Sequence, residues 1–234
     1  MYHYEVRFMS KRVLVTGASR GIGRALVCEL RKRDCTVFAT ARDGNALAEL
    51  AAETGCQTHI CDLSKPAVLD LYAVAQEALR GVDVLVNNAG FNNRKAAITN
   101  VSHEELDLQY AVNLRAPFLL GRDALRNMSA RGSGHIVNIL STVCHTNAET
   151  MAVYSAMKQG LRSVTDIMIK EAAAHGVKVT GVYPGGTNTG FRPNERTDYM
   201  NPAHVAHVIA DAIFSPDDVV MHTLTFRPLV ERNF

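Results

Sequence analysis

The sequence predicts an α/β fold in which one parallel sheet of seven strands is covered by helices on both faces. Strand-like runs alternate with helical patterns along the whole chain, as expected for a succession of strand–helix–strand units. The strand-like runs are apolar at consecutive positions, as in Val84-Leu85-Val86, which favours burial on both sides of a sheet. No repeat, linker or low-complexity tract divides the 234 residues, so we expect a single domain over 1–234.

Local patterns place the elements in order. A β-branched run at 13–15 enters a glycine-rich turn, and Ile22, Leu26 and Leu30 then share one face of a helix over 22–32, with the spacing of an amphipathic helix. Further strands are expected at 36–40, 57–61, 82–86, 135–140, 177–183 and 219–225. Further helices are expected at 45–53, 66–79, 102–110, 113–130, 151–175 and 202–214. Residues 1–10 are expected to form an N-terminal extension, and residues 190–201 a short substrate loop.

Composition excludes several classes of function. The net charge is +2 and no basic run exceeds a few residues, which argues against a nucleic-acid surface. No apolar stretch reaches the roughly 18–20 residues of a membrane span, and residues 1–10 lack the apolar core of a secretory signal. The five cysteines are odd in number and include no Cys-x-x-Cys pair, which favours reduced thiols. We therefore expect a cytoplasmic protein that binds neither nucleic acid nor membrane.

Two histidines on one expected helix have the spacing of metal ligands. His204 and His207 are three residues apart, but Val205, Val208 and Ile209 mark the apolar face of the same helix. The histidines are therefore expected to face solvent, and we expect no metal site.

The clearest chemical motif is Thr16-Gly17-Ala18-Ser19-Arg20-Gly21-Ile22-Gly23, between the first strand and the first helix. Glycines there let the backbone turn tightly and approach a pyrophosphate, and the helix N-terminus offers free N–H groups to the anion. Three glycines alone are also compatible with a plain strand-to-helix turn. Because the strand, the glycines and the helix are all in place, the motif predicts a doubly wound Rossmann-type fold that binds a dinucleotide.

The spacing Thr-Gly-x-x-x-Gly-x-Gly resembles that of the short-chain dehydrogenase/reductase family, and further motifs of this family follow in order. They are Asn87-Asn88-Ala89-Gly90, Asn113 after Val112, Ser141 after the fifth strand, Tyr154-Ser155-Ala156-Met157-Lys158, and Pro184-Gly185-Gly186-Thr187-Asn188-Thr189. Thirteen residues separate Ser141 from Tyr154, which is the usual interval in the family. The resemblance covers nearly the whole chain, and in its C-terminal portion it is greatest to the branch of 3-hydroxy acid dehydrogenases and carbonyl reductases.

The resemblance implies an NADP-dependent oxidoreductase with Asn113, Ser141, Tyr154 and Lys158 as catalytic residues. Hydride transfer to a carbonyl carbon places negative charge on the oxygen, and Tyr154 would deliver a proton there as general acid. Lys158 lies four residues on, on the same helical face, and would stabilise the tyrosinate and bond the nicotinamide ribose. Ser141 would donate a hydrogen bond to the substrate oxygen, and Asn113 would hold a water that links the lysine to solvent. Without the other motifs, Tyr154 would be read as a half-buried core or interface residue.

The resemblance also implies a cofactor site along the carboxyl ends of the strands. It places Asp62 against the adenine ring, with a turn or helix-cap role before Pro66 as the alternative. It places the segment from Thr187 to Thr189 at the nicotinamide carboxamide. The predicted cofactor-binding residues are Gly17, Ser19, Arg20, Gly21, Ile22, Gly23, Arg42, Asp62, Leu63, Asn88, Ala89, Gly90, Tyr154, Lys158, Pro184, Gly185, Thr187 and Thr189.

The end of the second strand favours NADP(H) over NAD(H). An acid at this point would bond the ribose 2′-hydroxyl of NAD, but Thr40 and Ala41 stand there. Arg20 and Arg42 could both reach a 2′-phosphate and form charge-assisted hydrogen bonds with it. The alternative is that both are solvated surface charges. Asp43 is the one neighbouring acid that would favour the ribose of NAD.

The substrate is expected to be a small molecule held between the nicotinamide and the segments 91–95, 142–151 and 190–200. Arg94, Lys95 and Arg192 would suit a carboxylate or phosphate, although exposed surface charge is the simpler interpretation. The motifs leave the substrate itself open.

The sequence leaves two alternative functions open, and the family resemblance also implies an oligomer. A 3-oxoacyl-thioester reductase is one alternative, but residues 219–228 lack the paired-glycine turn with which such reductases end. A non-catalytic NADP(H)-binding sensor is the alternative of another class, although such proteins typically lose the tyrosine or the lysine. By resemblance we also expect a homodimer or homotetramer that packs the helices bearing Asn113 and Tyr154.

Overall fold

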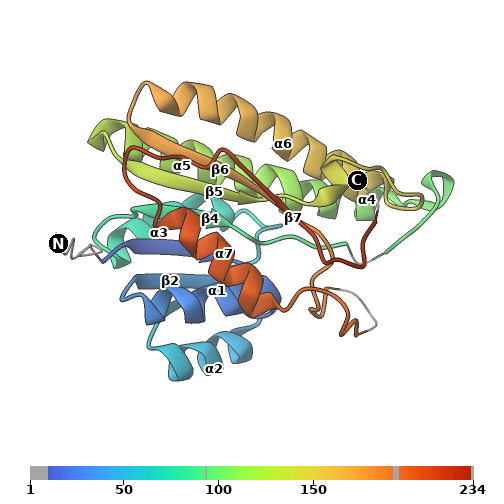
Figure 1. Ribbon diagram of the computed structural model, residues 1–234, viewed down its shortest axis with the longest axis horizontal. Helices are drawn as coiled ribbons and strands as arrows, with labels where there is room; N and C mark the ends of the chain where they lie inside the picture. Colours follow the sequence, from blue (N-terminus) through green and yellow to red (C-terminus); the bar gives the residue numbers. More distant parts are fainter. Residues whose placement is uncertain (1–9, 93, 192–194, 233–234) are drawn as a thin grey trace.

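The computed structural model describes residues 10–92, 94–191 and 195–232, so almost all of the expected N-terminal extension lies outside the described residues. Seven strands form one parallel sheet in the order β3-β2-β1-β4-β5-β6-β7 (Figure 1). The strands are β1 (Arg12–Thr16), β2 (Thr36–Ala41), β3 (Gln57–Ile60), β4 (Val84–Asn87), β5 (Gly134–Ile139), β6 (Val177–Pro184) and β7 (Thr223–Phe226). The predicted α/β class and the seven-stranded parallel sheet are confirmed.

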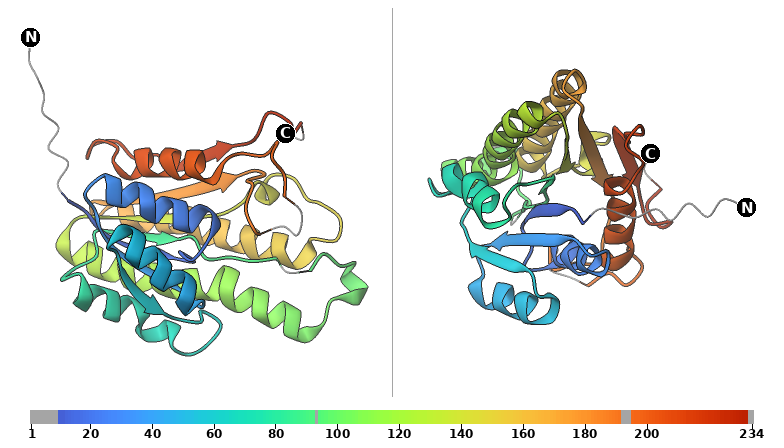
Figure 2. Two further views of the ribbon diagram at one scale, coloured as in Figure 1. Left: turned by 90° about the horizontal axis from the view of Figure 1, so that it is seen from below. Right: turned by 90° about the vertical axis from the view of Figure 1, so that its left-hand side faces the viewer.

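Helices cover both faces of this sheet, which Figure 2 shows end-on between its two helical layers. On one face α1, α2 and α7 pack through buried aliphatic side chains, and on the other face α3, α5 and α6 do so. The helices are α1 (Gly21–Lys32), α2 (Gly44–Thr54), α3 (Val68–Ala78), α4 (His103–Tyr110), α5 (Ala116–Arg131), α6 (Ala152–Ala173) and α7 (Pro202–Ile213). Short helical turns lie at η1 (Ile98–Asn100), η2 (Ala111–Arg115) and η3 (Thr142–Cys144).

The order of the strands creates the place where a ligand can bind. β1 pairs with β2 on one side and with β4 on the other, so the chain leaves β1 and returns to it from the opposite side. At such a switch point the loops after neighbouring strands diverge and leave a crevice at the carboxyl ends of the strands. The glycine motif directly follows β1 and therefore lies at this crevice.

Two elements differ from the sequence prediction. The last strand begins at Thr223 rather than at Val219. The Val219 carbonyl accepts hydrogen bonds from the Ser215 hydroxyl (3.0 Å) and the Lys178 ammonium (2.8 Å). Side chains thus satisfy this carbonyl, and the chain joins the sheet only four residues later. The helix expected from Asn113 begins instead as the π-helical turn η2, which joins α4 to α5.

The two histidines of α7 are exposed, as predicted. The expectation that Val208 is buried is wrong, because its side chain is 40% exposed. His207 lies 3.0 Å from a Glu29 carboxylate oxygen and 3.6 Å from one of Asp211, so it joins α7 to α1 by polar contacts. Among the described residues, no group of His, Cys, Asp and Glu side chains has the arrangement of a metal site.

Two structural findings bear on the compositional expectations. All five cysteines are free thiols. Within the part of the chain that the structure describes, no helix is both long enough and apolar enough to span a bilayer.

Candidate active site

A cleft of about 850 Å³ follows the carboxyl ends of the strands. Every predicted cofactor-binding residue lines it, and so do three of the four predicted catalytic residues, Ser141, Tyr154 and Lys158. The fourth, Asn113, is fully buried behind the wall of the cleft. The fold therefore brings segments that are far apart in the sequence to a single site.

The glycine cradle, residues 17–23, forms one end of the cleft. Gly17 and Gly21 have φ values of +66° and +56°, which side chains rarely tolerate. A Cβ at Gly17 would lie 2.7 Å from the Ala89 Cα, and one at Gly23 would clash with the Gly17 carbonyl oxygen. The Asn88 side chain donates hydrogen bonds to the carbonyls of Thr16 (2.8 Å) and Gly17 (3.1 Å). The cradle is thus tied to the end of β4.

The N-terminus of α1 opens onto this cradle. Arg20 is the N-cap residue in extended conformation, and no side chain in the described chain caps the first turn. That turn also contains no acidic residue. Its free N–H groups and positive dipole end suit an anion, so the cradle fits a pyrophosphate.

The ends of β2 and β3 form the next part of the cleft. Arg42 and Asp43 are both exposed and both line it. The Asp43 carboxylate also accepts a hydrogen bond from the Ala46 N–H (3.1 Å) and caps α2. That hydrogen bond uses only the Oδ1 of the one nearby acid that would favour the ribose of NAD. The buried Thr40 hydroxyl has no hydrogen-bond partner among the described residues and also lines the cleft.

Asp62 forms the predicted turn and also lies at the cleft. It lines the cleft, and its Oδ1 accepts hydrogen bonds from the Ser64 N–H (2.9 Å) and hydroxyl (2.8 Å), which close a turn. Burial raises the pKa of Asp62, but these hydrogen bonds and the nearby Arg42 and Lys65 outweigh it and hold the pKa below its usual value. The carboxylate is therefore ionised at neutral pH.

Asn113 forms hydrogen bonds with the backbone of the segment that follows β4. Its Oδ1 accepts a hydrogen bond from the Phe91 N–H (3.1 Å), and its Nδ2 donates to the Phe91 carbonyl (3.0 Å). Because η2 is π-helical, the local widening of the helix turns Asn113 toward this strand end, and such widened turns are common at functional sites. A Cβ at Gly90 would lie 3.0 Å from the Asn113 Oδ1 and 3.3 Å from the Lys158 Nζ. Glycine at position 90 therefore leaves room for the Asn113 amide and the Lys158 ammonium beside the backbone.

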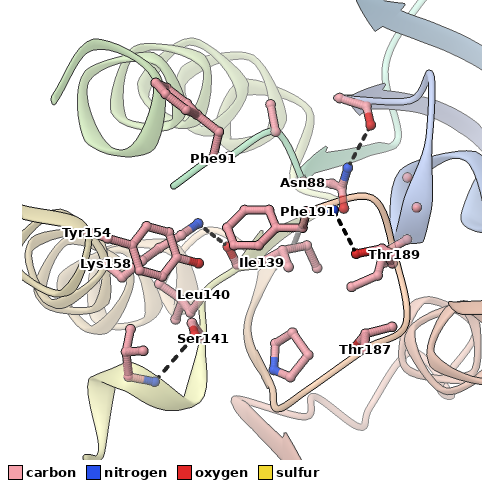
Figure 3. A pocket seen from close by; sticks show the side chains of 18 of the residues that line it. Asn88, Phe91, Ile139, Leu140, Ser141, Tyr154, Lys158, Thr187, Thr189 and Phe191 are labelled. Carbon is pink, nitrogen blue, oxygen red and sulfur yellow. Dashed lines mark hydrogen bonds between the residues drawn. The ribbon is translucent and has the colours of Figure 1, made fainter. Parts of the chain in front are cut away.

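Tyr154 and Lys158 extend from α6 into the cleft (Figure 3). Lys158 is only 3% exposed, and its Nζ donates a hydrogen bond to the Ile139 carbonyl (2.8 Å). The Nζ lies 5.9 Å from the centre of the Tyr154 ring. Burial lowers the pKa of Lys158 to about 8, the Cys144 thiol opposing this slightly. The lysine is thus a poised cation beside the phenol.

Ser141 lies two residues beyond the end of β5, across the cleft floor from α6. Its hydroxyl oxygen accepts a hydrogen bond from the Val143 N–H (3.3 Å) and caps η3. A serine hydroxyl that accepts one bond still has its own hydrogen to donate. The three side chains therefore offer a phenol, an ammonium and a hydroxyl to one cavity.

Phe191 and Tyr199, from the two described parts of the predicted substrate loop, line the same cleft. Thr187 and Met200 form a β-bridge that folds the loop back. The Phe191 N–H donates to the Thr189 hydroxyl (3.3 Å), and the Phe191 ring packs against the Tyr154 ring with centres 5.8 Å apart (Figure 3). Phe191 thus covers the phenol with an apolar ring.

The structure describes two of the three cations that would suit an anionic substrate, and they line different cavities. Lys95 lines the cleft, whereas Arg94 lines a separate cavity of about 10 Å³. Arg192 lies outside the described residues. The two described cations, Arg94 and Lys95, therefore do not share one cavity.

Sequence reasoning missed the residues that follow β7. Arg227, Val230, Glu231 and Arg232 line the cleft, yet no motif marks them and they lie far from every predicted site residue in sequence. Because β7 lies beside β6, the end of the chain passes over the loop that follows β6. Only the pairing of β7 with β6 in the sheet reveals that these residues line the cleft.

The fold and cleft define a dinucleotide-binding α/β oxidoreductase, and the comparisons with known proteins identify its family. Residues 11–200 match the family model for short chain dehydrogenases. The chain belongs to the short-chain dehydrogenase family.

Relatives are similar over nearly their whole length. An uncharacterized oxidoreductase of Staphylococcus aureus (strain MRSA252) is 30% identical over 227 residues, covering 94% of this chain and 97% of the relative. A metagenomic short-chain oxidoreductase solved in complex with NADP is 32% identical, with a TM-score of 0.85, covering 95% of this chain and 99% of the other. An alcohol dehydrogenase from the archaeon Thermococcus sibiricus, complexed with 5-hydroxy-NADP, is 25% identical with a TM-score of 0.87, covering 97% and 100%.

Proposed function

We propose that the protein transfers a hydride between NADP(H) and the carbonyl or alcohol carbon of a small substrate, with Tyr154 as general acid and base. The observation that carries this proposal is the convergence of Ser141, Tyr154 and Lys158 on a cleft whose other end is the glycine cradle. The nicotinamide, when bound, supplies or receives the hydride. The chain's own side chains manage the charge and the proton on the substrate oxygen.

Each of these side chains has a distinct task. In the reductive direction the substrate oxygen gains negative charge, and Tyr154 donates its phenol proton to it. The Lys158 ammonium stabilises the tyrosinate that remains, in a site where burial strengthens the attraction. The Ser141 hydroxyl donates a hydrogen bond to the same oxygen. Asn113 holds the backbone of Phe91 and thereby positions the wall beside Lys158.

The cofactor is NADP(H). Arg42 lines the cleft at the end of β2, where a guanidinium can form charge-assisted hydrogen bonds with a 2′-phosphate. The nearby Asp43 carboxylate caps α2 through its Oδ1. The complexes of the metagenomic oxidoreductase and the archaeal alcohol dehydrogenase with NADP or its 5-hydroxy derivative support the same choice.

The test is NADPH oxidation with a panel of 3-oxo acids, 3-oxoacyl thioesters, aldehydes, diketones and pterin-like ketones. Tyr154→Phe should lose about 10²–10⁴-fold in turnover, the usual contribution of a positioned general acid. The variant should still bind NADPH, as measured by cofactor fluorescence, because the cradle is unchanged. Turnover that is unaffected by Tyr154→Phe would refute the role of the phenol. Tight NADPH binding without turnover of any carbonyl would favour a sensor.

We also propose that the protein assembles through α4, α5 and α6. Several large apolar side chains are exposed on these three helices: Leu106, Tyr110, Phe118 and Ile167. Exposed apolar groups gathered on neighbouring helices are typical of interfaces between subunits. A homodimer or homotetramer would bury them. Light scattering at micromolar concentration tests this, and a monomer would contradict it.

A further inference from the structure

Three polar side chains, Asn87, Asn138 and Thr165, form a buried network that connects α6 with β5 and β4. The Asn138 Nδ2 on β5 donates a hydrogen bond to the Thr165 hydroxyl on α6 (2.9 Å). The Asn138 Oδ1 accepts one from the Asn87 Nδ2 at the end of β4 (2.9 Å). The Asn87 Nδ2 also donates to the Pro117 carbonyl in the first turn of α5 (3.3 Å). The buried network thus joins two helices and two strands.

The direction of the hydrogen bonds around Thr165 is fixed. Asn138 has no exposed surface, and the other two side chains of the buried network are at most 3% exposed. The Thr165 hydroxyl donates to the Leu161 carbonyl one turn earlier (2.7 Å), so its oxygen can only accept from Asn138. A shift of α6 along β5 would leave these buried polar atoms without partners, which is costly where no water replaces them. The buried network therefore opposes such a shift.

The same strand holds α6 at a second point. The residue after Asn138 is Ile139, whose carbonyl accepts a hydrogen bond from the Lys158 Nζ (2.8 Å; Figure 3). Lys158 and Thr165 are seven residues apart, which places them on one face of a helix, two turns and about 10 Å apart along its axis. Contacts at two heights fix both the position of α6 along β5 and its rotation about its own axis.

We propose that Asn138 and Thr165 are positioning residues that fix the place of α6 against β5 and thereby align the catalytic side chains. Tyr154 lies eleven residues before Thr165, on the same face of α6, and Ser141 follows β5. A shift of α6 would move the phenol relative to the Ser141 hydroxyl, and a misplacement of about 1 Å can lower a rate about 100-fold. Neither Asn138 nor Thr165 lines the cleft, so each acts through the helix. This inference rests on the proposed function.

The experiment measures the single-turnover rate of hydride transfer from NADPH to the best carbonyl compound of the panel. Thr165→Val keeps the branched shape of threonine but leaves the Asn138 Nδ2 without its acceptor. We expect the rate of hydride transfer to fall about 10- to 100-fold. The Kd values for NADPH and for the carbonyl compound should change by less than about threefold, because the cleft wall is unchanged. Thr165→Ser keeps the hydroxyl and should restore the rate.

Two further variants separate alignment from stability. The double variant Asn138→Leu/Thr165→Val replaces both partners by apolar side chains, which removes the unpaired polar group that Thr165→Val creates. Its hydride transfer should still be about tenfold or more slower than that of the wild type. Thr180→Val removes another fully buried threonine hydroxyl, which contacts His135 on β5 (2.7 Å) rather than α6, and should keep the wild-type rate. A wild-type rate in the double variant, or an equal loss in Thr180→Val, would overturn the proposal.

A measurement that needs no turnover reports the same alignment. NMR of protein with ¹³C-labelled lysine gives the pKa of Lys158, whose signal is assigned by its loss in Lys158→Met. A shift of α6 in Thr165→Val weakens the hydrogen bond from the ammonium to the Ile139 carbonyl, so the pKa of Lys158 should fall by about half to one pH unit. Tyr154 and the Cys144 thiol are the titratable groups beside this ammonium, and neither is altered in the variant.

This measurement distinguishes a failure of the inference from a failure of the proposed function. The pKa of Lys158 should be the same in Thr180→Val as in the wild type. An unchanged pKa in Thr165→Val would overturn the inference, whether or not a carbonyl compound is reduced. A lowered pKa in a protein that reduces no carbonyl compound would uphold the positioning by Thr165 and refute the proposed reaction.

Discussion

The buried ammonium of Lys158 should impose a measurable cost on the stability of the cofactor-free protein. Burial lowers the pKa of this lysine from 10.5 to about 8. At about 1.4 kcal/mol per pH unit, the protonated folded state is disfavoured by about 3 kcal/mol at neutral pH. The unfolded chain keeps this proton to a higher pH than the folded protein does. The cost is therefore fully present below pH 8 and is relieved as the pH rises from about 8 to 10.5.

Urea unfolding at about pH 7 and about pH 10 measures this effect. Relative to Lys158→Met, which has no proton to lose, the wild-type protein should gain about 2–3 kcal/mol of unfolding free energy between the two pH values. Comparison within each pH removes the contribution of other groups that titrate in the same range. Lys65→Met, which removes an exposed lysine, should keep the wild-type pH dependence. Parallel pH dependence of wild type and Lys158→Met would refute the reasoning.

Three further predictions follow from the site and the surface. Arg42→Ala should raise the Kd for NADPH by about tenfold or more and leave that for NADH unchanged, because the lost bonds involve the 2′-phosphate; equal effects in fluorescence titrations would remove Arg42 from the cofactor site. Gly23→Ala should abolish NADPH binding and lower the free energy of unfolding by about 1–3 kcal/mol, because the methyl group would clash with a carbonyl of the cradle; unchanged urea unfolding would show that the cradle can relax. Phe118→Glu, at a 45% exposed position on α5, should dissociate the proposed oligomer in light scattering, and an unchanged mass would exclude α5 from the interface.

The order of the helices and strands could be predicted from the sequence, and their bounds to within a few residues. Apolar runs such as the one at β4 and the helical spacing of Ile22, Leu26 and Leu30 are local signals, because each element buries its own apolar face. The motifs predicted to bind the cofactor were equally recognisable in the sequence. The glycine cradle and the Tyr154–Lys158 pair are short motifs whose geometry follows from one turn or one helix.

Contacts between distant segments could not be predicted in this way. Sequence periodicity suggested a strand from Val219, but the carbonyl of that residue is satisfied by the side chains of Ser215 and Lys178. Sequence spacing also did not reveal that Asn113 would lie on a π-helical turn and bond the Phe91 backbone at both of its polar atoms. In each case at least one partner lies on a segment distant in sequence, so the outcome depends on packing.

The sequence by itself determined the α/β class, the seven parallel strands and the glycine cradle, because each of these is written in local pattern and motif. The tertiary structure alone decided that Glu231 lines the cleft. That placement depends on β7 pairing beside β6 and on the C-terminal turn closing over Gly185 and Gly186. The pairing of neighbouring strands brings Gly186 and Glu231 into contact although they are 45 positions apart. A local sequence pattern carries no information about such a contact.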